Sequence, residues 1–252
     1  MPQEGCGQCQ LATRVPKCDD PTTVNSPIVQ IYTMQSVEEA LAVAAVGVDH
    51  LGVTPSDQGL PGEITNSRAA EICSALIGVA TSVALSVETD LDAIEAMVNE
   101  VGPDILHLCA PAGALEPARV EMLRRRIPRT PIMQAIAVTG PESVEVARSY
   151  ARFVDYLILD SVNPNIAGVG AAGTIHDWDV SAAIVAAVER PVILAGGLSP
   201  GNVAAAIARV RPAGVDSLTH TNRPVASGGF EKDLGKVERF VLGARGATPS
   251  DE

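Results

Sequence analysis

Three observations predict that the sequence forms one α/β domain, a closed barrel of eight parallel strands surrounded by helices. Short apolar runs alternate with helical patterns along the chain, and eight such runs occur. The length of 252 residues suits one (β/α)8 or TIM barrel of about 250 residues. An open doubly wound sheet is the alternative. No Gly-x-Gly-x-x-Gly motif follows the first apolar run, which weighs against a dinucleotide-binding fold.

The predicted strands are short and apolar, as expected for a parallel sheet that is covered on both faces. Hydrophobic residues make up 46% of the chain and aromatic residues only 3%, so Ala, Val, Leu and Ile must build the core. In chain order the predicted strands are Ile28–Tyr32, His50–Val53, Ser82–Ser86, Ile105–Cys109, Ile132–Ala137, Tyr156–Asp160, Val192–Ala195 and Val215–Leu218.

Helix-start signals lie between these runs. Ser36 and Glu39 form a capping box ahead of an Ala-rich stretch, which predicts that the first helix begins there. Two prolines lie where the first turn of a helix tolerates proline. The later start signals are Asn66 or Ser67, then Asp90, Pro141 and Pro200.

Three segments are predicted from composition. Residues 1–27 are polar, without an apolar period, and form an N-terminal extension. Residues 28–243 form the barrel, and residues 244–252 form a flexible C-terminal tail.

The charge and cysteine content narrow the classes of partner and cofactor. A net charge of −12 makes nucleic acid an unfavourable partner, and no apolar run reaches the roughly 18 residues of a membrane span. The N-terminus lacks a signal-peptide pattern, so we expect a cytoplasmic protein without a disulfide framework. The extension contains Cys6, Cys9 and Cys18 without a nearby His. An unliganded arm is favoured over a zinc or iron–sulfur site, and no metal or cofactor is predicted.

The strongest candidate for a ligand site is the glycine-rich segment after the seventh predicted strand. Gly196 and Gly197 allow close approach to the backbone, and the following helix start offers free N–H groups. Phosphate is favoured over a simple tight turn, because such barrels often bind phosphate after strands seven and eight. A second glycine-rich loop, which contains Gly173, precedes a further predicted helix and is suited to fold over a ligand. In that loop, a capping role for Asp177 and a core position for Trp178 are favoured over catalysis.

Titratable residues at the carboxyl ends of other strands are further candidates. Asp160 ends an apolar strand, where partial desolvation suits a general acid, although it could instead brace a loop. His107 and Cys109 share one face of the fourth predicted strand, and a structural role is an equal alternative for the histidine. Thr219 and His220 follow the last strand and could bind an oxyanion or belong to an ordinary loop.

The segment from Val192 to Asp216, with Asp160 and the Gly173-to-Trp178 loop before it, resembles the phosphoribosylanthranilate isomerase family. That resemblance implies a TIM barrel and an Amadori-type aldose–ketose isomerisation, with Asp160 as the general acid. The family's base is a cysteine that ends the first strand, and Tyr32 holds that position here. Further departures are Leu60 to Gly62 in place of the family's Ser-Pro-Arg, Cys109-Ala110 in place of His-Gly, Thr174 in place of a lysine, and a changed run from Asp216 to Asn222.

Together these features predict an isomerase that performs an enolisation-type step on a phosphorylated sugar-like substrate. Asp160 is expected to work with Tyr32 or Cys109. One alternative is a true phosphoribosylanthranilate isomerase of tryptophan biosynthesis with a rebuilt site. Another is a catalytically silent barrel that binds a metabolite or a protein partner. A small phosphorylated metabolite is the expected partner, and a homodimer is left open.

Overall fold

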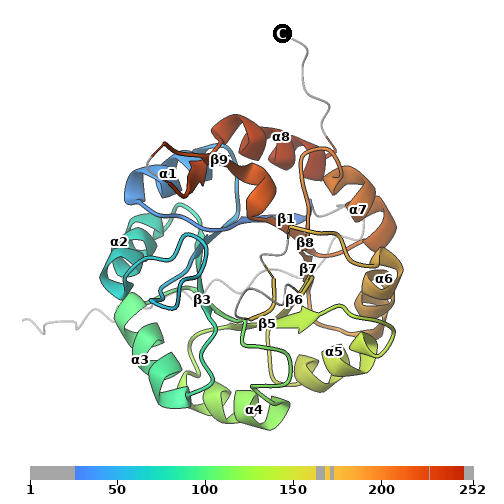
Figure 1. Cartoon of the computed structure of the whole chain (residues 1–252). Helices are drawn as coiled ribbons and strands as arrows, with labels where there is room; N and C mark the ends of the chain where they lie inside the picture. Colours follow the sequence, from blue (N-terminus) through green and yellow to red (C-terminus); the bar gives the residue numbers. More distant parts are fainter. Residues whose placement is uncertain (1–25, 163–167, 171–172, 227, 247–252) are drawn as a thin grey trace, which may run out of the picture.

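The computed structural model describes residues 26–162, 168–170, 173–226 and 228–246, and these residues form the predicted barrel (Figure 1). Eight parallel strands close in chain order, and each pairs with the next, with β8 returning to β1. The TIM-barrel prediction is therefore confirmed. The strands are β1 (Ile28–Ile31), β2 (His50–Val53), β3 (Thr81–Ser86), β4 (Ile105–Leu108), β5 (Ile132–Ala137), β6 (Tyr156–Asp160), β7 (Val192–Leu194) and β8 (Gly214–Ser217).

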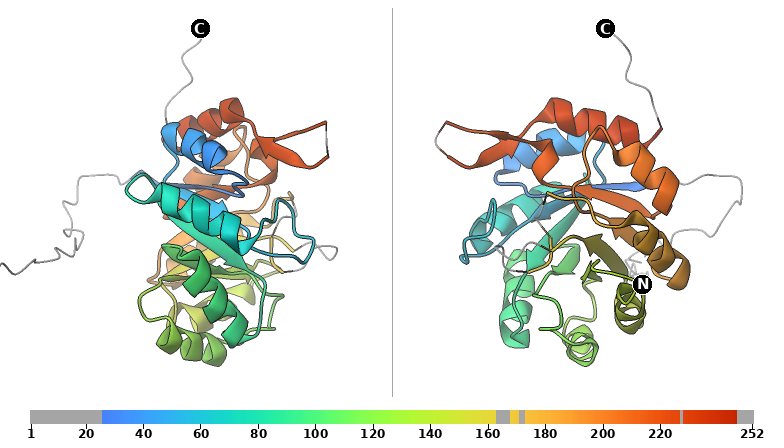
Figure 2. Two further views of the ribbon diagram at one scale, coloured as in Figure 1. Left: turned by 90° about the vertical axis from the view of Figure 1, so that its left-hand side faces the viewer. Right: turned by 45° about the vertical axis from the view of Figure 1, so that its right-hand side comes forward.

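A ring of helices covers the outside of the barrel, one after each strand (Figures 1 and 2). Within the described residues none of them has the length and hydropathy of a membrane-spanning segment. They are α1 (Val37–Ala45), α2 (Asn66–Leu76), α3 (Leu91–Val101), α4 (Pro117–Arg126), α5 (Ser143–Ala151), α6 (Trp178–Ala187), α7 (Val203–Val210) and α8 (Leu234–Ala244).

Local sequence signals place most helix starts within a few residues. Ser36 caps α1 by accepting a hydrogen bond from the Glu39 amide at 3.1 Å, and Asp90 caps α3, both as predicted. The cap of α2 is Thr65, one residue before the predicted Asn66 or Ser67. Its hydroxyl accepts from the Arg68 amide at 3.2 Å, which is the capping geometry that fixes the first turn.

The two prolines that were predicted inside first helical turns lie outside the helices. Pro141 precedes α5, which begins at Ser143, and Pro200 precedes α7, which begins at Val203. Both prolines lie in turns that lead into these helices, where the fixed φ of proline is also suitable.

An antiparallel hairpin between β8 and α8 is absent from the sequence prediction. It consists of β9 (Asn222–Pro224) and β10 (Phe230–Lys232), preceded by the 3-10 helix η1 (Thr219–Thr221). In Figure 2 the hairpin projects from the barrel beside α8. Because its strands have three residues each, apolar periodicity could not reveal them.

The core has two parts. The larger cluster lies between the sheet and the helices, and the smaller cluster fills the barrel interior. The predicted extension, with Cys6, Cys9 and Cys18, and the last residues of the predicted tail lie outside the described residues, so these segments stay predictions.

Candidate active site

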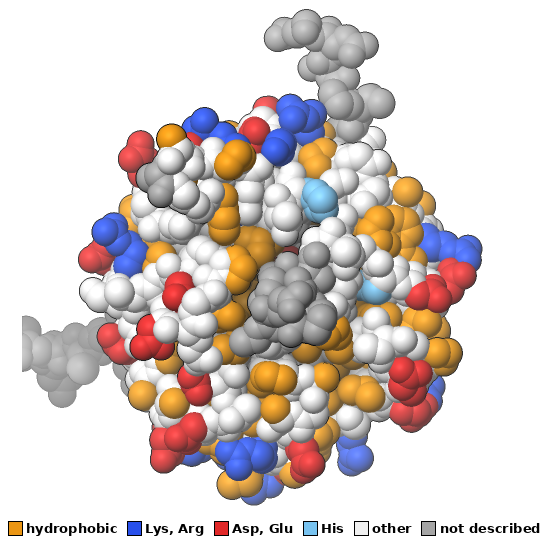
Figure 3. Space-filling model, viewed as in Figure 1, with side chains coloured by type: hydrophobic (Ala, Val, Ile, Leu, Met, Phe, Trp, Pro, Cys, Tyr) orange, Lys and Arg blue, Asp and Glu red, His pale blue; other side chains and the backbone are white. Residues whose placement is uncertain are grey.

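The candidate site lies at the carboxyl ends of the strands, on the face that Figure 1 shows. On this face hydrophobic side chains gather around the centre, and charged side chains lie mostly toward the outer edge (Figure 3). Two adjoining cavities open here and share Asp160, Asp216 and Leu218. We call them the apolar pocket, which is lined by Leu60, Pro61, Leu85, Val87 and Ile158 among others, and the glycine cup, which is lined by Gly173, Gly196, Gly197, Ser217, Thr219 and His220.

Asp160 is the last residue of β6, and its carboxyl group lines both cavities. Burial raises its pKa to about 7, while the hydrogen bond that Oδ1 accepts from the Ser161 amide at 2.6 Å acts in the opposite direction. The backbone of Gly170 passes so close that a Cβ there would lie 2.5 Å from Asp160 Oδ2. A carboxyl with a pKa near neutrality can hold or release a proton at physiological pH.

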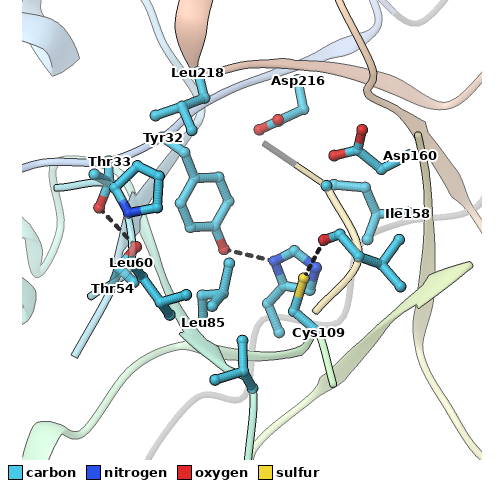
Figure 4. A pocket seen from close by; sticks show the side chains of 15 residues that line it. Tyr32, Thr33, Thr54, Leu60, Leu85, Cys109, Ile158, Asp160, Asp216 and Leu218 are labelled. Atoms are coloured by element: carbon cyan, nitrogen blue, oxygen red, sulfur yellow. Dashed lines mark hydrogen bonds between the residues drawn. The ribbon is translucent and has the colours of Figure 1, made fainter. Parts of the chain in front are cut away.

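Asp216 lies next to Asp160 where the two cavities adjoin (Figure 4). It lies inside β8 with only 7% of its surface exposed. Its Cα pairs in register with that of Gln30 on β1, and Gln30 Nε2 donates a hydrogen bond to Asp216 Oδ1 at 3.1 Å. Burial raises the pKa of Asp216 to about 8. The Asp160 charge adds to that rise, and the Gln30 hydrogen bond and the Lys232 charge oppose it.

Tyr32, which follows β1, occupies the floor of the apolar pocket, and its hydroxyl meets His107 Nδ1 at 3.0 Å (Figure 4). Gly52 on β2 makes room for the ring, because a Cβ there would lie 2.1 Å from Tyr32 carbons. Burial raises the pKa of Tyr32 well above 10, and burial lowers that of His107 to about 3. The pair is therefore neutral, and the phenol and the imidazole share one hydrogen bond whose donor depends on the histidine tautomer.

Cys109 follows β4 beside this pair, as the shared strand face predicts. Its thiol donates to the Val169 carbonyl at 2.6 Å, and burial raises its pKa to about 12. A thiol with such a pKa stays protonated at neutral pH, where it is a poor nucleophile and a poor base.

The glycine cup combines the ends of β7 and β8 with the loop before α6. Gly196 and Gly197 both have positive φ, and a Cβ at Gly197 would lie 2.7 Å from the Thr174 backbone. Within the described part of the chain the amides of these two glycines donate to no protein acceptor. Unpaired amides at a strand-to-helix turn suit an anion such as phosphate.

The loop before α6 closes one side of the cup. His220 Nε2 contacts the Gly173 carbonyl at 3.2 Å, which joins two residues that the sequence singled out separately. His176 bridges the hydroxyls of Ser161, at 3.2 Å, and Ser181, at 2.8 Å. Asp177 caps α6, as its structural interpretation predicts, by accepting from the Asp179 amide at 2.8 Å. Trp178 packs against the core as a partly buried residue.

Sequence reasoning missed Lys232. This lysine in β10 is only 4% exposed, and its ammonium donates to the Tyr32 carbonyl, to Asn222 Oδ1 at 2.5 Å and to the Leu218 carbonyl at 3.5 Å. It thereby ties the carboxyl ends of β1 and β8 to the hairpin. No local pattern marks it, because the groups that surround it are distant in sequence.

The charge distribution of the apolar pocket is one-sided. The described residues that line it include the acids Asp160 and Asp216 and no Lys or Arg. The described residues also form no group of three or more His, Cys, Asp or Glu that could hold a metal ion. The arrangement supports proton transfer between two facing carboxyl groups, next to an anion cup.

Comparisons with known proteins agree on one family. A family model described as N-(5'-phosphoribosyl)anthranilate (PRA) isomerase matches residues 29–242. The N-(5'-phosphoribosyl)anthranilate isomerase of Haloferax volcanii is 34% identical over 222 residues, which cover 87% of this chain and 93% of that protein. The enzyme of the same name from Methanocella arvoryzae is 33% identical over 84% of this chain and 95% of that protein.

Solved structures lead to the same fold. The crystal structure of phosphoribosyl anthranilate isomerase from Thermotoga maritima matches with a TM-score of 0.72 and 25% identity, and the match covers 87% of this chain and 99% of that one.

Proposed function

The chain belongs to the N-(5'-phosphoribosyl)anthranilate isomerase family, and we propose that it catalyses that isomerisation, the conversion of an N-linked aldose phosphate to the aminoketose. The isomerase prediction is confirmed at the level of the family. Within it, the prediction of a true phosphoribosylanthranilate isomerase of tryptophan biosynthesis has more support than that of a different sugar phosphate.

One observation carries the proposal: the glycine cup and the apolar pocket adjoin each other at two acidic side chains. A ligand whose phosphate occupies the cup and whose aromatic ring occupies the pocket would place its sugar at Asp160 and Asp216. Oriented groups on both sides of a reacting sugar are what an isomerase of this kind requires.

In this proposal Asp160 is the general acid that opens the furanose ring. It would donate its proton to the ring oxygen while the bond between that oxygen and the anomeric carbon breaks. The nitrogen lone pair then forms the iminium. A pKa raised by burial to about 7 keeps a protonated fraction at neutral pH, which supports this role.

The phosphate contacts proposed for Gly173, Gly196, Gly197, Thr219 and His220 follow from the same pose. Exposed backbone amides and the polar side chains of η1 would surround the phosphate without a lysine or arginine. His107 would contribute indirectly, by fixing the Tyr32 hydroxyl at the floor of the apolar pocket.

The experiment is steady-state turnover of phosphoribosylanthranilate by purified protein without added metal, followed by the loss of anthranilate fluorescence. We expect turnover by the wild-type chain and a loss of about 100-fold or more for Asp160→Asn. Rescue of a tryptophan auxotroph that lacks this isomerase is a second readout. No turnover together with no rescue would overturn the proposal.

A second candidate substrate follows from the one-sided charge of the apolar pocket. Because no Lys or Arg lines it among the described residues, a 5-phosphoribosylamine without the aromatic carboxylate would fit it with less electrostatic cost. Phosphoribosylaniline is the matched probe. Faster turnover of this compound than of phosphoribosylanthranilate would favour the second candidate.

A further inference from the structure

We propose that Asp216 is the catalytic base of this site and removes the proton from C2 of the sugar. The inference rests on the proposed function and deepens it, because the position that holds the family's cysteine base is filled here by Tyr32.

The position of Asp216 is the first argument. Asp160 and Asp216 line both cavities from β6 and β8, and Figure 4 shows the two side chains as neighbours in the pocket. A substrate that spans the cup and the pocket must pass between these two groups. The ring oxygen and C2 both neighbour the anomeric carbon, so one acid and one base are needed close together.

The other titratable groups of the two cavities are hydrogen-bonded, weakly basic or remote. The Tyr32 hydroxyl is directed to His107, and the Cys109 thiol donates to the Val169 carbonyl. His107 contacts Tyr32 through Nδ1 and its buried Nε2 has no partner among the described residues, but burial lowers its pKa to about 3, which makes it a weak base. His220 lies at the rim of the cup, where it contacts the Gly173 carbonyl. Asp216 is the group left beside Asp160.

The surroundings of Asp216 suit a base that must ionise in a confined space. Gln30 Nε2 donates to Oδ1 at 3.1 Å, which favours the carboxylate and fixes its orientation. Gln30 is itself held by His50, whose Nδ1 lies 3.2 Å from Gln30 Oε1. Of the two Asp216 oxygens, Oδ2 has no hydrogen-bond partner among the described residues, so it is free to accept the substrate proton.

The proton transfers balance over the cycle. After ring opening, Asp216 takes the proton from C2, and the C–H electron pair forms the C1=C2 bond while the iminium nitrogen becomes neutral. The protonated Asp216 then returns its proton to C1. The enol hydroxyl loses its proton to the Asp160 carboxylate as the ketone forms. The product is an isomer of the substrate, and both carboxyl groups regain their initial states.

Deuterium exchange separates this step from ring opening. The probe is the aminoketose product, 1-(o-carboxyphenylamino)-1-deoxyribulose 5-phosphate, incubated with enzyme in D2O, and the readout is deuterium at C1 by NMR or mass spectrometry. We expect Asp216→Asn to lose about 100-fold or more in both exchange and turnover. Asp160→Asn should retain more exchange than turnover, because turnover uses Asp160 both in ring opening and at the ketone oxygen, whereas exchange uses it only at the ketone oxygen.

The matched control is Asp57→Asn, the same substitution at an exposed residue on the same face and outside both cavities. Asp57→Asn should exchange and turn over like the wild type. An unfolding transition shows that the Asp216→Asn variant is folded. The inference would be overturned if this variant exchanges deuterium within about threefold of the wild-type rate. In that case wild-type turnover would leave the proposed function standing. A wild type that neither turns over the substrate nor exchanges the product would overturn both.

Discussion

Replacing Asp216 by Asn should change stability in a way that depends on pH, because the native site holds this carboxyl away from water. Asn keeps the shape and still offers an oxygen to the Gln30 amide, which donates to Asp216 at 3.1 Å. It removes only the capacity to ionise. The groups that face Asp216 are the Asp160 carboxyl, the Gln30 amide and the Lys232 ammonium.

The direction of this pH dependence follows from the pKa values of Asp216 in the folded and unfolded states. The pKa of Asp216 is 3.8 when unperturbed and about 8 in the folded protein, mainly because of burial. The folded state therefore binds more protons over this range, so its stability is highest below the unfolded pKa and falls as pH rises toward 8. Each pH unit changes the free energy of unfolding by at most about 1.4 kcal/mol. Between pH 5 and pH 8 the largest possible change is therefore about 4 kcal/mol.

We expect a measured change of about 1–3 kcal/mol, since water and nearby polar groups screen part of the penalty. The assay is urea unfolding of the wild type and Asp216→Asn at pH 5 and pH 8. Relative to wild type, the variant should gain stability between these pH values. Asp57→Asn, at an exposed site, should stay within about 0.5 kcal/mol at both. An equal effect of Asp216→Asn at pH 5 and pH 8 would refute the reasoning.

Two further substitutions test the Tyr32 pair and the glycine cup. Tyr32→Phe leaves His107 Nδ1 without the partner that it has at 3.0 Å, so urea unfolding should give a loss of about 1–3 kcal/mol. The control Tyr156→Phe removes a hydroxyl that makes no hydrogen bond to a described residue, and it should lose less than about 0.5 kcal/mol. Equal losses would mean that the hydrogen bond contributes nothing. Gly197→Ala brings a Cβ to 2.7 Å from the backbone at φ +65°, and we expect KM for the phosphorylated substrate to rise about tenfold or more, equivalent to about 1.4 kcal/mol. Gly201→Ala, with its nearest atom at 3.8 Å, should keep the wild-type KM, and an unchanged KM for both variants would contradict phosphate binding in the cup.

The facing carboxyl pair gives a physical reason for the stability cost of this site. Burial raises the pKa of Asp160 to about 7 and that of Asp216 to about 8, so ionising either group near neutral pH costs more free energy than it does in water. Such pairs supply an acid and a base in one place, at the expense of stability. Removing either charge should therefore stabilise the fold while it abolishes the proposed chemistry.

The sequence by itself determined the barrel and part of the site. Short apolar runs placed β1 to β8 within one or two residues, because such runs are a local property of the chain. The rule that barrel sites lie at strand ends selected Asp160 and the pair Gly196-Gly197. An acidic residue inside the apolar run of β8 was a signal that pointed to Asp216, and it could have been read as such.

Only the tertiary structure decided how these residues meet. Asp216 and Gln30 are 186 positions apart, Tyr32 and His107 are 75 apart, and Lys232 and Tyr32 are 200 apart. Barrel closure between β1 and β8 creates the first contact, and the hairpin that carries Lys232 creates the last. The apolar strand before Asp160 indicated desolvation locally, but the burial and pKa shifts of Tyr32, His107 and Lys232 depend on long-range contacts that no local stretch of the chain reveals.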